Sequence, residues 1–230
     1  VLCSAFAKTL ARAGAKVALL DLNEEAAQSF ADEITAEGGV AKAYKCNVLD
    51  KAVCYEVADA VEKDFGKCDI LVNGAGGNNP RATTDKEYFE EGDIDADTKS
   101  FFDLDASGVE FVFNLNFLGT LIPTQAFARQ MVGREGCNII NISSMAAHLG
   151  FSEVVPYCVS KSAVCGLTRG LAVEWANDNI CVNSIAPGWF PSEMNKQVMK
   201  FFHLAVKIVT VCFVVIDGSL STVLIRDEDG

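Results

Sequence analysis

The chain has 230 residues, of which 50% are hydrophobic, and this size and composition suit a single domain, residues 1–230, with a large core. The formal net charge of −12 argues against a nucleic-acid partner and against binding to an anionic membrane surface. The apolar run 201–216 contains His203 and Lys207 and is shorter than the roughly 20 residues that a membrane span needs. We therefore expect no membrane segment.

The cysteines indicate a reducing compartment. There are nine, with no Cys-x-x-Cys pair, and most fall within predicted strands or helices. Buried free thiols explain this distribution most simply, so we predict no disulfide, no metal site and a cytoplasmic location. No signal peptide is expected at the start of the chain.

Apolar strand-like segments alternate with amphipathic helix-like segments, which is typical of an α/β fold with a parallel sheet. The predicted helices are 3–13, 24–37, 51–65 and 109–130, and a further helix carries Tyr157. The predicted strands are 17–20, 41–48, 70–72, 139–142, 180–185 and 210–218.

The chemistry is concentrated between residues 138 and 175. Ser144 follows an apolar strand, and Tyr157 and Lys161 are four residues apart, which places them on one face of a helix. Lowering the pKa of a tyrosine from about 10 to near neutrality takes about 4 kcal/mol. One ammonium group about 4.5 Å away supplies about 3.7 kcal/mol at an effective dielectric constant of about 20, so we expect Lys161 to lower the pKa of Tyr157.

This arrangement resembles the short-chain dehydrogenase/reductase family, whose active site is a Ser, a Tyr and a Lys, with an Asn from the preceding helix. The resemblance implies a Rossmann-type doubly wound parallel sheet and hydride transfer between a nicotinamide cofactor and an alcohol/carbonyl pair. It implies catalytic roles for Ser144, Tyr157 and Lys161. Asn116 matches the fourth catalytic residue, which holds a water that relays protons toward the lysine.

The cofactor implied is NAD. Asp21 ends the second strand of the family pattern, where an acidic residue accepts hydrogen bonds from the adenosine ribose and repels a 2′-phosphate. An Asp at the end of a strand often caps the following helix instead of binding a ligand. Here Asn23 could also cap that helix. The resemblance assigns further cofactor contacts to Asn47, Val48, Asn73, Gly74, Ala75, Gly76, Tyr157, Lys161, Pro187, Gly188 and Ser192.

Two parts of the family pattern are missing or short. The first strand and its TGxxxGxG turn are not present, and Cys3 stands where the last glycine would be. Either the sequence is an N-terminally truncated piece of a complete enzyme or the protein lacks the turn. The region at about 193–209 is shorter than the substrate-covering lid of the resembled enzymes.

The polar segment between Gly77 and Val109, with its GGNNP and ATTDKEY runs, resembles the short-chain-type D-mannonate oxidoreductases. That implies a sugar-acid substrate, whose hydroxyl and carboxylate groups Asn78, Asn79 and Arg81 would contact. The alternative is that these three loop residues are only solvated.

Small residues in the Tyr157 helix permit close packing, and resembled proteins pair this helix between subunits, so we expect a homodimer or homotetramer. The alternatives are a reductase of a polyol or a 3-ketoacyl substrate, or a non-catalytic assembly partner.

Overall fold

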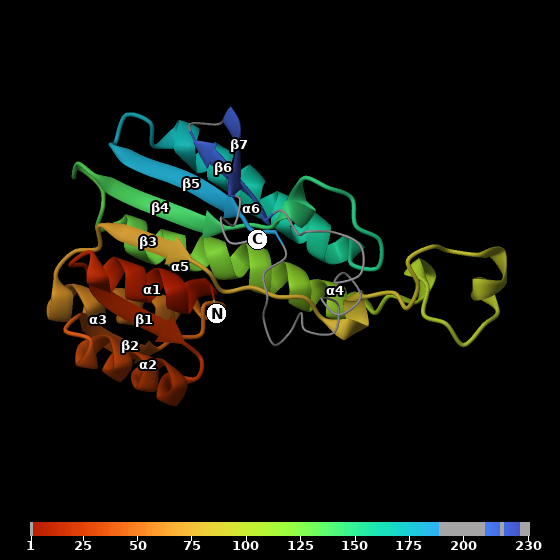
Figure 1. The fold of residues 1–230 in the computed structure, drawn as a ribbon, viewed down its shortest axis with the longest axis horizontal. Helices are drawn as coiled ribbons and strands as arrows, with labels where there is room; N and C mark the ends of the chain where they lie inside the picture. The colour runs from red at the N-terminus through yellow and green to blue at the C-terminus, as the bar shows by residue number, and fades with distance from the viewer. Residues whose placement is uncertain (1, 189–209, 217–218, 226–230) are drawn as a thin grey trace.

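The structure is a computed structural model that describes residues 2–188, 210–216 and 219–225, the last two segments by their backbone. Helices alternate with strands along most of the chain (Figure 1). The helices are α1 Leu2–Arg12, α2 Glu24–Ala36, α3 Lys51–Phe65, α4 Ala106–Phe113, α5 Gly119–Ala128 and α6 Val155–Glu174. The strands are β1 Lys16–Asp21, β2 Val40–Lys45, β3 Ile70–Asn73, β4 Cys137–Ile142, β5 Ile180–Ala186, β6 Thr210–Ile216 and β7 Ser219–Ile225.

The strands form two sheets. β1 pairs with β2 in parallel, and the second sheet has the order β3-β4-β5-β6-β7, in which β3, β4 and β5 are parallel. Within the described residues no ladder joins β1 to β3, which is where the family pattern places the strand that we expected to be missing. The predicted Rossmann-type α/β fold is confirmed.

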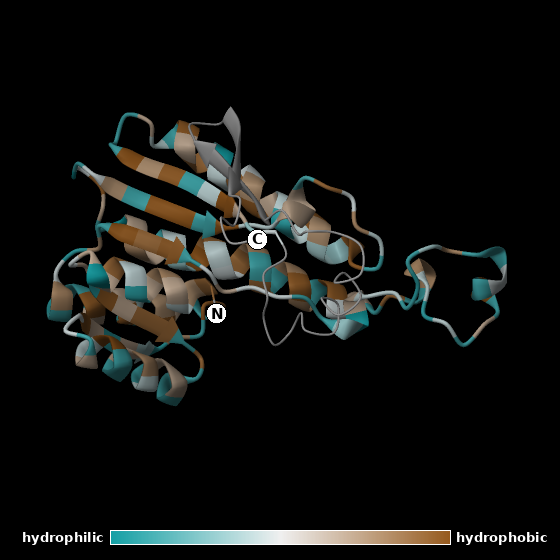
Figure 2. Ribbon diagram, viewed as in Figure 1, coloured by the Kyte–Doolittle hydropathy of each residue, from teal (hydrophilic) through white to brown (hydrophobic). Residues whose placement is uncertain are grey.

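Strand β1 is covered on both of its faces. Val17 and Leu19 pack against α1 and α2, where Ala7, Ala11 and Ile34 are buried. Ala18 and Leu20 point the other way, into the larger core formed with α3, α5 and β4. Because successive side chains of a strand alternate between its faces, this pattern places helices on both sides of the sheet. Figure 2 shows that hydrophobic residues, in brown, make up much of β3, β4 and β5.

The end of the second sheet differs from a purely parallel arrangement. The predicted strand 210–218 is present as β6, but it runs antiparallel to β5. Strand β7, which was not predicted, pairs antiparallel with β6 as a hairpin. The shortened lid expected at about 193–209 lies outside the described residues, as does Ser192.

The helix predicted for 109–130 is present, but it is interrupted by a π-turn. The chain forms α4, a π-helical turn at Asn114–Leu118 and then α5. In the π-turn the amide of Gly119 donates to the carbonyl of Asn114, five residues earlier. A π-turn inserts an extra residue into a helix and is frequent at functional sites. Here the turn carries Asn116, whose side chain is fully buried.

Two general expectations can be compared with the described residues. The eight cysteines outside β6 are free, and Cys46, Cys54, Cys137 and Cys165 are buried, whereas Cys3 and Cys181 are exposed. No described helix combines the length and the hydropathy needed to cross a membrane.

A buried chain of polar side chains crosses the second sheet. Asn73 on β3 donates its amide to Asn141 on β4 and to Thr124 on α5, both at 2.9 Å. Asn141 in turn donates to the hydroxyl of Thr168 on α6 at 3.0 Å. A buried polar group is costly unless its hydrogen bonds are made, so this chain fixes β3, β4, α5 and α6 relative to one another.

We expect Asn141→Ala to lower the free energy of unfolding by about 2 to 3 kcal/mol, because the buried Asn73 amide and the buried Thr168 hydroxyl each lose one hydrogen-bond partner. Asn138 lies on the same strand, and its side chain bonds only to the exposed Gly136 carbonyl. Asn138→Ala should therefore change stability by less than about 0.5 kcal/mol. Urea unfolding of both variants measures the difference, and equal effects would contradict the structural role of the buried chain.

Candidate active site

Helix α6 and the end of β4 bring three of the predicted side chains together. Ser144 follows β4 and is buried, and it forms a hydrogen bond with Tyr157 on α6. Lys161 lies one turn further along α6 and is only 5% exposed. Its ammonium donates to the carbonyl of Ile142 at 2.9 Å, so the last residue of β4 holds the lysine side chain in place.

The pKa values in this cluster are set mainly by burial. Burial raises the pKa of Tyr157 above its usual value, and the hydrogen bond with Ser144 opposes this rise. Burial also lowers the pKa of Lys161 to about 8. The expectation that Lys161 lowers the pKa of Tyr157 is therefore wrong. Its ammonium is 5.9 Å from the centre of the tyrosine ring and is turned toward Ile142, while removal from water destabilises the phenolate.

Asn116 clamps the chain that follows β3. Its Oδ1 accepts the amide of Gly77, and its Nδ2 donates to the carbonyl of the same glycine, both at 2.9 Å. Nδ2 also donates to the hydroxyl of Ser160 on α6 at 2.9 Å, and this hydroxyl donates to the carbonyl of Tyr157 at 2.7 Å. One buried amide therefore connects the residues after β3 to the helix that carries Tyr157.

Gly76 lies at the centre of this arrangement. A Cβ atom added there would be 2.6 Å from Oδ1 of Asn116 and 2.9 Å from the ammonium of Lys161. A side chain at this position would have to displace both polar groups, so glycine lets the backbone after β3 approach them without disturbing either one. Of the four predicted residues, Asn116 and Lys161 thus meet at the end of β3, while Tyr157 lies next to Lys161 on α6 and Ser144 lies next to Tyr157.

The residues predicted to hold adenosine follow β1 and β2. Asp21 ends β1, and its Oδ1 accepts the amide of Asn23, while its Oδ2 has no hydrogen-bond partner within the described part of the chain. Asn23 caps α2 through its own side chain, so Asp21 is not the helix cap. Asn47 is exposed and Val48 packs against Gly119. An open, exposed carboxylate at the end of a parallel strand suits the hydroxyls of a ribose.

The residues after β3 and β5 face the same edge of the sheet. The side-chain amide of Asn73 donates its hydrogen bonds to Thr124 and Asn141, so it is not available to a ligand. Gly74 is in contact with Cys3, whose Sγ fills the space that a Cβ at Gly74 would need. Pro187 follows β5, and its carbonyl accepts the amide of Met145 next to Ser144. Ala75 and Gly188 follow β3 and β5 in the same way.

The polar side chains proposed for substrate contacts have partners of their own. Asn79 caps the short helix at Pro80–Ala82, and Asn78 donates to Thr83 at 2.9 Å. Arg81 donates to Ser107 at 2.9 Å and lies 3.6 Å from the Asp105 carboxylate. These contacts fix the loop near the start of α4.

Several buried residues at the site were not predicted, although they left a signal in the sequence. The missed residues are Ser160, which holds Asn116, and Asn141, which anchors β4. In each case a polar residue stands at a position where the hydrophobic periodicity of the strand or helix predicts an apolar one. His148, four residues after Ser144, places its Nε2 3.7 Å from the thiol of Cys165 on α6.

The fold and the site define a nicotinamide-dependent oxidoreductase of the α/β class, and the comparison with known families agrees. Residues 2–201 match the family profile of the short chain dehydrogenases. The chain belongs to this family, whose members are oxidoreductases.

Three similar proteins show the range of the resemblance. An uncharacterized oxidoreductase of Haemophilus influenzae is 54% identical over 199 residues, which cover 86% of this chain and 70% of the relative. The 5-keto-D-gluconate 5-reductase of Escherichia coli is 35% identical over 191 residues, covering 83% and 68%. A solved structure of a candidate D-mannonate oxidoreductase from Haemophilus influenzae, with bound NAD, is 53% identical with a TM-score of 0.83, covering 86% of this chain and 70% of that one.

The burial of Lys161 predicts a pH-dependent cost to stability. The pKa of about 8 in the folded chain lies below the ordinary 10.5, so between these pH values the unfolded chain binds more protons and stability rises with pH. Below pH 8 the cost is about 3 kcal/mol. We expect Lys161→Met to be about 2 kcal/mol more stable than the wild type at pH 7, since it also loses the bond to Ile142, and this gain should shrink toward pH 10.5.

Denaturant unfolding at several pH values between 7 and 10.5 measures this effect. The exposed Lys67 provides a matched control, and Lys67→Met should give a difference from wild type that does not vary with pH. A stability difference for Lys161→Met that is constant over this range would contradict the assignment.

Proposed function

We propose that the chain is an NAD-dependent oxidoreductase that interconverts a sugar acid and its keto form, with D-mannonate and D-fructuronate as the pair. The observation that supports the reaction type is that Asn116 and Lys161 meet at Gly76, with Tyr157 next to Lys161 on α6 and Ser144 next to Tyr157. Identity above 50% to a protein described as a candidate D-mannonate oxidoreductase supports the substrate.

The four side chains have distinct roles in this proposal. NAD, when bound, exchanges the hydride with the substrate carbon. The hydroxyl of Ser144 orients the reacting substrate oxygen, and Tyr157 exchanges a proton with it. Because burial raises the pKa of Tyr157, the phenol is protonated at neutral pH and suited to donating that proton during reduction. Lys161 holds the ribose next to nicotinamide, and Asn116 fixes the turn after β3.

The remaining cofactor contacts follow the carboxyl ends of the strands. Asp21 accepts the adenosine ribose hydroxyls, and Asn47 and Val48 border the adenine. Asn73, through its backbone, and Gly74, Ala75 and Gly76 would help to hold the nicotinamide end of NAD. Pro187 and Gly188 would do so from the end of β5, and Ser192 would bind the carboxamide.

The substrate carboxylate would be recognised by the loop before α4. Arg81 is exposed, and its ion pair with Asp105 is also exposed, so a substrate carboxylate could replace Asp105 at small cost. The enzyme acts as a homodimer or homotetramer through the exposed small residues of α6. The four buried free thiols favour the cytoplasm as its compartment.

We expect the chain to oxidise NADH with D-fructuronate, and Tyr157→Phe to lower turnover at least 1,000-fold by removing the proton donor. Tyr55 on α3 supplies a matched control, because its half-buried ring contacts Lys51 and Arg129 and none of the four site residues that are named above. Tyr55→Phe should keep wild-type turnover. Loss of NADH absorbance measures both variants, with circular dichroism as the check on folding.

Other outcomes separate the competing functions. Turnover with a polyol or a 3-ketoacyl substrate but not with a sugar acid would identify another short-chain reductase. NADH binding without turnover of any of these substrates would favour the non-catalytic assembly partner. Turnover retained in Tyr157→Phe would exclude the proposed mechanism.

We expect Asp21→Asn to reduce the preference for NADH over NADPH about tenfold. The substitution keeps an oxygen for the amide of Asn23 but removes the charge that repels a 2′-phosphate. Asp32→Asn, on the exposed side of α2, removes an equal charge and should leave the preference unchanged. Fluorescence titration with both nucleotides measures the ratio, and equal effects of the two variants would refute a specific role for Asp21.

A further inference from the structure

Residues 85–104 form an arm that projects from the body of the protein (Figure 1). Its base is closed by Asp85 and Lys99, which exchange two hydrogen bonds at 2.8 and 2.9 Å. Just before the arm, the amide of Thr84 donates to the carbonyl of Glu153 at 3.0 Å, which attaches the base to the loop that leads into α6. The arm is therefore anchored at one end only.

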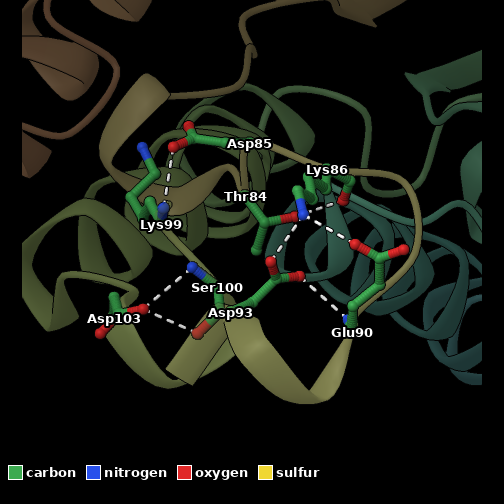
Figure 3. A network of polar contacts seen from close by, with 8 residues as sticks. All are labelled: Thr84, Asp85, Lys86, Glu90, Asp93, Lys99, Ser100 and Asp103. Atoms are coloured by element: carbon green, nitrogen blue, oxygen red, sulfur yellow. Dashed lines mark hydrogen bonds and ion pairs between the residues drawn. The ribbon is translucent and has the colours of Figure 1, made fainter. Parts of the chain in front are cut away.

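The arm holds its own shape through polar contacts (Figure 3). The ammonium of Lys86 lies 2.6 Å from Asp93 and 3.0 Å from Glu90, and it lowers the pKa of the buried Asp93. Further along, the amide and the hydroxyl of Ser100 both donate to Asp103. Because these bonds lie within the arm, it presents a defined surface without support from the body.

That surface is aromatic. Tyr88, Phe89, Phe101 and Phe102 are between 53% and 74% exposed, and we call these four residues the aromatic patch. The ring of Phe102 stands edge to face against Phe89 and Phe101, with centroids 5.8 and 6.1 Å away. Aromatic side chains bury about 150–250 Å² each, so the open part of the patch is roughly 400–600 Å². A stable interface needs about 800 Å² on each partner.

The aromatic patch continues into the outer face of α6. Phe89 and Phe101 line a cavity of about 170 Å³ together with Val155, the first residue of α6. That volume is comparable to the ~150 Å³ cavity that accepts a benzene molecule, so it can take one apolar side chain. Val159 and Val173 extend the apolar surface along the helix and are exposed. The aromatic patch alone falls short of the area that a stable dimer needs, so a stable contact would have to include this face of α6.

Charge narrows the choice of partner. Nine residues from 85 to 105 are acidic and two are basic, which opposes contact with an anionic lipid surface.

The outer face of α6 has room for another helix. Gly166 and Gly170 on α6 have nothing within 4 Å of an added Cβ atom, so another helix could approach closely there. A surface that pairs with its own copy around a two-fold axis is the commonest protein assembly.

We propose that the aromatic patch docks on a second copy of this chain, as an extension of the contact between paired α6 helices, with an apolar side chain of the second copy filling the cavity beside Val155. The inference rests on the homo-oligomer of the proposed function. It adds a second contact, made by the arm, which reaches beyond the helix pair.

The contact can be captured directly by photo-crosslinking the purified chain with benzoylphenylalanine in place of Phe102. A mixture of ¹⁵N-labelled and unlabelled chains distinguishes a crosslink between copies from one within a copy. We expect a product of twice the chain mass that contains mixed-isotope peptide pairs. Crosslinks confined to single chains, or no crosslink at concentrations where the chain is oligomeric, would overturn the proposal.

A second measurement separates the arm from the oligomer itself. We expect the double variant Phe101→Ser with Phe102→Ser to have a subunit dissociation constant at least tenfold higher than that of the wild type. Sedimentation velocity at several protein concentrations measures both constants. Val40→Ser with Val132→Ser removes two exposed apolar side chains outside the arm and should match the wild type.

The possible results are distinct. Unchanged assembly of the arm variant would overturn the docking of the arm while leaving the homo-oligomer intact. A monomeric wild type would overturn both, while the catalytic proposal is tested separately by comparing the NADH turnover of Tyr157→Phe with that of the wild type. Circular dichroism confirms that the arm variant is folded, and the crosslinking result stands independently of that variant.

Discussion

The site depends on the pair of hydrogen bonds by which Asn116 holds the backbone of Gly77. These bonds set the position of Gly76, whose missing side chain leaves room for the Asn116 oxygen and the Lys161 ammonium. The same amide reaches Ser160, so the end of β3 and helix α6 share one polar contact. A buried amide with every partner in place is rigid, because each alternative position would leave a polar group unpaired.

The electrostatics of the site reflect a conflict between stability and chemistry. Burial disfavours both the ammonium of Lys161 and the phenolate of Tyr157, and the protein keeps both groups in place nonetheless. The carbonyl of Ile142 compensates part of the cost for the lysine. A site that retains a poorly solvated ammonium beside a protonated phenol is costly to fold, which is expected where the groups serve a reaction rather than the fold.

The sequence was informative where one physical rule dominates. Alternating apolar and amphipathic segments predicted the α/β fold, and the four-residue spacing of Tyr157 and Lys161 placed them on one helix face. The rest depended on three-dimensional context. The π-turn at Asn116 arises from competition among helix hydrogen bonds, and the direction of the Tyr157 pKa shift depends on burial, which no spacing reveals. The direction in which β6 pairs with β5 was likewise not visible in the strand's own residues.

The arm and the site are joined through the loop between Ser144 and Tyr157. Glu153 in this loop adopts a φ of +63°, a conformation that costs a non-glycine residue free energy and persists only where neighbouring contacts hold it. One such contact is the amide of Thr84 at the base of the arm. Val155, two residues before Tyr157, borders the cavity beside the aromatic patch. A second copy that covers the patch would therefore also restrain the loop that positions Tyr157, so that assembly and the order of the site would be coupled.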